Sequence, residues 1–156
     1  EISCSLVGSE MCIRDSSETA QQELQVLGEA LREIMDYAYR SFTAVDAQTA
    51  RRIEPVEEVV DDMVATLRTN HIRRLRDGQC TVYAGLVFLD ILINAERIAD
   101  QCSNLGVYTI SQFDPSVMNS HHEYIHRLHQ GNDPVFNREY QEKHEKYFGM
   151  LSAIND

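Results

Sequence analysis

Two pairs of acidic residues in this chain have a spacing that suits metal binding. The first pair is Glu57 and Asp61, and the second is Glu96 and Asp100. Residues four apart on a helix lie one turn apart on the same face, so each pair presents two carboxylates together. If the two helices pack side by side, four oxygen ligands converge at their seam, and such clusters suit hard or borderline cations. The spacing therefore predicts a carboxylate metal site, although acids at this spacing are also common on solvated helix faces.

The helix around Glu96 and Asp100 bears directly on this prediction. Residues 80–110 are largely apolar and contain no proline, which predicts one helix of seven or more turns. Apolar residues on two sides predict a central helix with neighbours on both. One stripe comprises Val82, Leu86, Leu89, Ile93, Glu96, Asp100, Asn104 and Val107. Acids that face a core need ion pairs, hydrogen bonds or a cation, and pairing with Arg68 or Arg97 is the metal-free alternative.

The first acidic pair lies on a helix predicted over residues 47–76. The apolar face of this helix comprises Ile53, Val56, Val60, Met63, Val64 and Leu67. On a helical wheel, Glu57 and Asp61 flank that face, whereas Glu58 and Asp62 are predicted to point into solvent. Only the pair formed by Glu57 and Asp61 is therefore expected to look inward.

The remaining chain predicts an all-α fold with no strand. Asp46 is a predicted N-cap, and Pro55 predicts either a kink or a fresh helix start. Further helices are predicted over residues 17–42, 120–129 and 134–153, with a turn-rich connection over 111–120. This gives a bundle of three long helices with two additional, shorter C-terminal helices.

Residues 1–16 show no sustained periodicity and are predicted to be a non-native or disordered segment, which leaves one domain over 17–156. The net charge of −11 argues against a nucleic-acid partner, because phosphate binding requires a basic surface. No run reaches the ~18 apolar residues of a membrane span, so no direct membrane insertion is expected. The four cysteines have no metal or disulfide spacing, which favours a reducing, cytoplasmic compartment.

Three histidines provide a weaker metal candidate. His122, His126 and His129 share one helical stripe that could hold zinc, although such a stripe on a short polar helix is usually plain surface. A carboxylate-bridged di-metal enzyme is a further alternative, and it requires Glu-x-x-His motifs on two helices. Only Glu123 with His126 has that spacing. Catalysis is therefore not expected.

The strings VEEVVDDM and ILINAERIADQCSNLG resemble the PhoU domain, an all-helical regulator of phosphate uptake. The likeness extends over most of the chain after residue 20 and is greatest to the C-terminal PhoU domain of bacterial sodium/phosphate cotransporter proteins. It implies a three-helix bundle that can bind a multinuclear iron or zinc cluster. By position, the implied ligands are Glu57, Asp61, Glu96 and Asp100.

The resemblance also implies partners. A membrane phosphate transporter or an associated sensor kinase is expected, with membrane association only through a fused or partner transporter. Full PhoU proteins contain two such bundles and this chain predicts one, so the second is expected to come from a homodimer or from sequence missing here. A metal-free helical interaction module is the alternative function.

Overall fold

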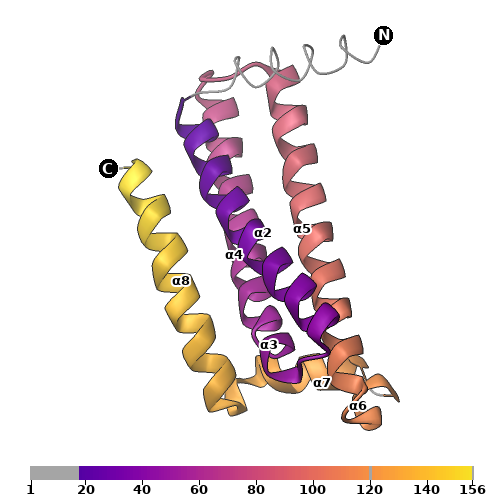
Figure 1. Cartoon of the computed structure of the whole chain (residues 1–156). Helices are drawn as coiled ribbons and strands as arrows, with labels where there is room; N and C mark the ends of the chain where they lie inside the picture. The colour runs from indigo at the N-terminus through magenta and orange to yellow at the C-terminus, as the bar shows by residue number, and fades with distance from the viewer. Residues whose placement is uncertain (1–17, 120, 156) are drawn as a thin grey trace, which may run out of the picture.

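Long helices that lie side by side dominate the part of the chain that the structure describes, residues 18–119 and 121–155 (Figure 1). The helices of this computed structural model are α2 (Glu18–Ala44), α4 (Ile53–Arg76), α5 (Val82–Ser111) and α8 (Pro134–Asn155). No strand occurs in those residues, which confirms the all-α prediction. The predicted segment 1–16 lies outside them. No described helix is long and apolar enough to cross a membrane.

Short helices close one end of the bundle (Figure 1). They are α3 (Ala47–Ala50), α6 (Pro115–Asn119), α7 (His121–Arg127) and a π-helical turn, η1 (Leu128–Asn132). The last two occupy the segment that was predicted as one short helix. The predicted turn-rich connection is partly wrong, because α6 forms within it. Asp114 Oδ1 accepts a hydrogen bond from Ser116 N at 3.1 Å, which is a local cap that favours a helical turn.

The sequence signals for helix ends hold in the structure. Asp46 caps α3 by accepting a hydrogen bond from Gln48 N at 2.9 Å. Pro55 lies in the first turn of α4, where its missing N–H has no intrahelical partner to lose, so the predicted fresh start is confirmed. Gly78 has a φ of 70° after α4, a left-handed conformation that glycine adopts at little cost. Thr81 then caps α5.

The predicted apolar face of α4 is buried throughout, but the predicted stripe of α5 from Val82 to Val107 is largely exposed. Its buried side consists mainly of small residues with a few large ones: Ala84, Gly85, Phe88, Leu92, Ala95, Ala99, Cys102, Ser103, Gly106, Val107, Thr109 and Ile110. Val82, Leu86 and Ile93 are exposed instead. The reason is close packing, because small side chains let α5 lie near its neighbours, and hydrophobicity alone does not reveal this. At Gly106, an added Cβ would lie 2.9 Å from Ile53 Cδ1.

Helix α8 packs along α2 and α4, on the side of the bundle away from α5 (Figure 1). It has 22 residues against 24 in α4, so it acts as a fourth long helix. Glu33 of α2 anchors it. The Glu33 carboxylate accepts hydrogen bonds from Lys143, Lys146 and the Tyr147 hydroxyl, and these contacts lower its pKa to about 2 despite burial. Since η1 leads directly into α8, this anchor also fixes the segment that contains His129.

The Glu33 anchor predicts the effect of removing one hydroxyl group. We expect Tyr147→Phe to lower the free energy of unfolding by about 1.5–3 kcal/mol, since a fully buried donor to a carboxylate is lost. Tyr39→Phe, at a tyrosine that is 69% exposed, is the matched control and should have little effect. Urea denaturation of both variants measures the difference. Equal stabilities would show that the hydroxyl contributes nothing to docking α8.

Candidate metal centre

A row of four acids on α4 forms one wall of a cavity of about 490 Å³. The four are Glu54, Glu57, Glu58 and Asp61, whose spacing of three, four and seven places them on one helical face. Glu54 and Glu57 are 6% and 8% exposed. Such burial is unusual for glutamate, which is rarely buried without a partner.

Helix α5 forms the facing wall, and α7 with η1 covers the end. The remaining residues around the cavity are Asp100, Gln101, Ser103 and Asn104 from α5, with Ile125, His126 and His129 from the covering segment. Ser103 Oγ donates a hydrogen bond to Glu54 Oε2. The seam between α4 and α5 is thus where the carboxylates converge, as the spacing predicted.

His129 binds two of these acids at once. Its Nε2 lies 2.9 Å from Glu54 Oε1, and its Nδ1 lies 3.2 Å from Glu58 Oε2. These contacts, led by the hydrogen bond to Glu54, raise the pKa of the imidazole, which donates from both nitrogens when it is protonated. One ligand atom each from Glu54, Glu57 and His129 lie within 4.8 Å of one another. These three residues form a group that could hold a metal ion.

The remaining acids are poorly compensated. Burial, with repulsion from Glu54 and Asp61, raises the pKa of Glu57 to about 9. Burial and repulsion from Glu96 raise the pKa of Asp61 to about 6. Asp61 Oδ1 is buried and has no hydrogen-bond partner among the described residues. Charges of one sign in a partly dry site favour uptake of protons or of a cation.

The structure brings together three of the four predicted carboxylate ligands. Glu57, Asp61 and Asp100 line the cavity, whereas Glu96 does not. Glu96 pairs with Arg68 at 3.3 Å, which is one of the two arginine partners considered in the metal-free alternative. The expectation that Glu96 and Asp100 face the core is wrong, because Asp100 is exposed and the Glu96 side chain is 42% exposed. The small residues on the opposite face of α5 are the buried ones.

The two metal sites predicted separately turn out to be adjacent. His126 and His129 line the carboxylate cavity, while the side chain of His122 lies outside what the structure describes. The prediction that Glu58 points into solvent is wrong, because His129 of η1 folds over it. Asp62 was also predicted to be solvated, and it accepts a hydrogen bond from Tyr140 of α8 at 2.6 Å. Both errors arise because the contacting residues, His129 of η1 and Tyr140 of α8, come from far along the chain.

Glu54 is the residue that the sequence interpretation missed. Its three-residue spacing from Glu57 was available in the sequence as the string EPVEEVVDD. Its contact with His129 spans 75 positions of sequence, so no local pattern predicts it.

The chemistry of this donor set fits a cation. Carboxylate oxygens with one imidazole are ligands that iron and zinc accept in proteins. The buried, unpaired Asp61 oxygen and the proton-holding Glu57 are the features that a bound cation would satisfy. In the metal-free protein, a proton on Glu57 removes part of the negative charge instead.

The raised pKa of Glu57 predicts how stability depends on pH. Between 4.5, the ordinary value for a glutamate, and about 9, the folded protein keeps a proton that the unfolded chain releases. Stability from this group therefore falls as the pH rises through that range. The raised pKa of His129 acts in the same direction above 6.5. We expect the chelator-treated protein to lose at least about 1 kcal/mol between pH 6 and pH 9, as measured by urea denaturation.

A matched pair of variants isolates the cause. Glu57→Gln preserves the shape of the side chain without its titration, so it should flatten the dependence and be more stable than the parent protein at pH 9. Glu29→Gln, at an exposed glutamate of α2, should keep the parental dependence. An unchanged pH slope in Glu57→Gln would contradict the assignment.

Comparison with known proteins agrees with this architecture. The PhoU domain matches residues 24–109, which is more than half of the chain. A curated relative is the "Phosphate-specific transport system accessory protein PhoU homolog 1" of Thermotoga maritima, which is 27% identical over 110 residues. The alignment covers 67% of this chain and 46% of the relative, so the chain spans less than half of that protein. No solved structure matches significantly. The chain belongs to the PhoU family.

Proposed function

We propose that this chain is a metal-binding regulatory module of phosphate uptake. The observation that supports this most is the cavity between α4 and α5, where buried acids meet His129. Family membership and the name of the Thermotoga maritima relative point to phosphate transport. Iron or zinc is the cation that the ligand set suits, and a multinuclear cluster would use the further carboxylates around the cavity.

A bound cation would crosslink separate segments at this end of the bundle. Its ligands would come from α4 and η1, with Asp100 of α5 lining the same cavity. Binding would therefore join segments that are otherwise linked by hydrogen bonds and packing alone. The surface around the cavity is where a membrane phosphate transporter or its sensor kinase would detect the metal-bound state. The closer relation to sodium/phosphate cotransporter proteins stays a prediction from the resemblance.

A catalytic role has little support in the geometry. The Glu-x-x-His spacing that a di-metal enzyme needs occurs at Glu123 and His126, and Glu123 is exposed and does not line the cavity. A metal-free interaction module is the second candidate. The pairing of Glu96 with Arg68 favours it, because that contact satisfies one acid without a cation.

The metal proposal predicts a specific loss of binding. Iron(II) and zinc(II) should bind the chelator-treated protein, and the double variant Glu54→Gln, Glu57→Gln should reduce affinity at least roughly tenfold. Competition with a fluorescent chelator measures affinity, and circular dichroism confirms folding. Glu29→Gln is the control for loss of a surface charge. Unchanged affinity in the double variant would contradict the site, and absence of binding in the parent protein would favour the metal-free module.

Helix α5 also offers a contact surface. Val82, Leu86 and Ile93 are 75%, 63% and 47% exposed and lie on one stripe of the helix. A contiguous apolar stripe of this kind is typical of an interaction site. Because the PhoU resemblance implies two such bundles and this chain has one, a second copy of the chain is the partner that we propose for this stripe.

The stripe predicts the oligomeric state. We expect a concentration-dependent dimer in sedimentation equilibrium, and Leu86→Glu should shift it to monomer because a charge would be buried at the contact. Ile72→Glu, at an apolar residue of α4 that is 58% exposed, is the matched control and should leave the dimer intact. A parent protein that stays monomeric at high concentration would contradict self-association through this stripe.

A further inference from the structure

A second cavity, of about 600 Å³, lies at the end of the bundle where α3, α4, α7, η1 and α8 meet. It is larger than the acidic cavity and falls within the range of small-molecule sites. Arg51, Arg52 and Arg138 all line it. In a chain with a net charge of −11, three arginines around one cavity are a local concentration of positive charge.

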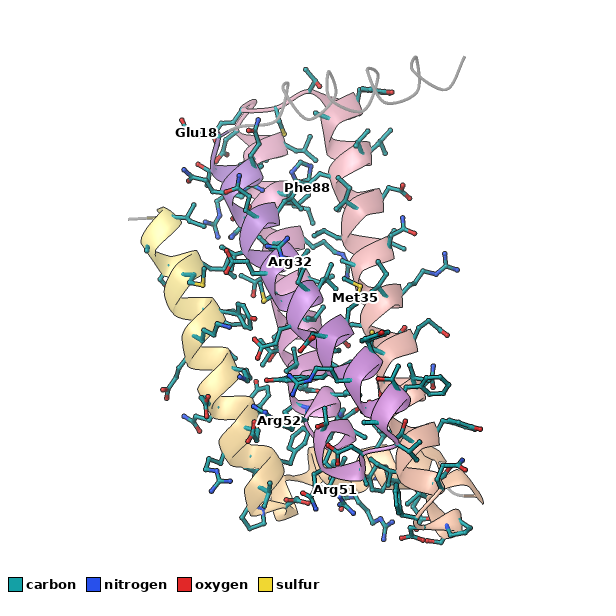
Figure 2. All side chains as sticks on the ribbon, viewed as in Figure 1. Glu18, Arg32, Met35, Arg51, Arg52 and Phe88 are labelled. Carbon is teal, nitrogen blue, oxygen red and sulfur yellow. The ribbon has the colours of Figure 1, made fainter. Side chains whose placement is uncertain are left out.

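Only one of these arginines has its charge paired. Arg52 lies 3.5 Å from Glu139 Oε2, and its guanidinium stacks over the Tyr37 ring at 4.6 Å. Arg51 and Arg138 are exposed and form no ion pair with any residue that the structure describes. Figure 2 shows Arg51 and Arg52 toward the lower end of the bundle, near the start of α8.

The two acids that line this cavity, Asp133 and Glu139, form no ion pair with Arg51 or Arg138. Glu139 is engaged by Arg52. Asp133 Oδ1 accepts hydrogen bonds from Val135 N at 2.9 Å and Phe136 N at 3.1 Å, so it caps the start of α8. The three arginines outnumber the two acids in the cavity lining, which leaves a net charge of +1.

The rest of the cavity lining suits the apolar or aromatic part of a ligand. Pro55, Leu128 and Val135 contribute aliphatic surface, and Tyr124 and Phe136 contribute rings. Phe136 is only 8% exposed and stacks with Tyr140, so its ring is held in place. A fixed aromatic ring next to exposed arginines is a combination that binds a flat ring and an anionic group of the same molecule.

We propose that this cavity binds an organic phosphate of nucleotide size, with the phosphoryl group on Arg51 and Arg138 and the ring against Tyr124 and Phe136. Arginine suits this role because its planar fork binds phosphate oxygens in pairs. The site is separate from the carboxylate cavity and needs no metal. It therefore goes beyond the regulatory function proposed above, and neither proposal depends on the other.

Adenosine monophosphate is the probe that tests this proposal. Titration of the full chain, followed by ¹H–¹⁵N NMR, should shift the amide signals of Arg51, Tyr124, Phe136 and Arg138. Adenosine, which lacks the anion, and inorganic phosphate, which lacks the ring, should each bind at least roughly tenfold more weakly, since each keeps only one of the two contacts. No binding of adenosine monophosphate, or equal binding of inorganic phosphate, would overturn the proposal.

Variants at exposed positions separate binding from folding. The double variant Arg51→Gln, Arg138→Gln should weaken binding of adenosine monophosphate at least roughly tenfold. Arg73→Gln, at an exposed arginine near the opposite end of α4, should leave it unchanged. Val135→Trp fills the cavity from a residue that is 58% exposed and should also block binding without changing charge. Full affinity in both the double variant and Val135→Trp would place the ligand elsewhere and refute the proposal.

Discussion

The repulsion among buried carboxylates on α4 is the constraint on which the rest of this structure depends. Glu54, Glu57 and Asp61 lie within two turns of one helix, and the packing of α5, α7 and η1 removes water from them. Carboxylates of like charge cannot all ionise in such a place. The site must therefore contain protons or a cation, and the raised pKa of Glu57, to about 9, reflects that requirement.

The remainder of the fold holds these mutually repelling carboxylates in place. The apolar face of α4 is buried in the core, so its acidic face is fixed toward α5 and η1. Gly106 lets α5 approach the first turn of α4 closely, which sets the width of the seam. Glu33 docks α8 through Lys143, Lys146 and Tyr147, and α8 in turn fixes the position of η1 and His129. Repulsion among the acids destabilises this site, and the packing of α5 and the ion pairs that dock α8 compensate for it.

Local signals were enough to predict the long helices, their caps and the inward pair on α4. Asp46, Pro55 and Gly78 act through their immediate neighbours, so their roles could be predicted from the sequence. The orientation of α5 could not, because its buried side is set by small residues that pack closely rather than by hydrophobicity. The contribution of His129 to the site could not be predicted from the sequence either, because its contact with Glu54 depends on how a distant segment folds back over α4.

Anomalous X-ray diffraction from crystals grown with zinc or iron is the most direct test of the central claim. A cation that replaces the protons of the cluster should give an anomalous peak within bonding distance of Glu54, Glu57 and His129, at roughly 2.0–2.2 Å for zinc. Further peaks near Asp61 and Asp100 would indicate a multinuclear cluster. Peaks confined to surface histidines, with the hydrogen bonds between His129 and Glu54 intact, would contradict the account and leave a site that is balanced by protons alone.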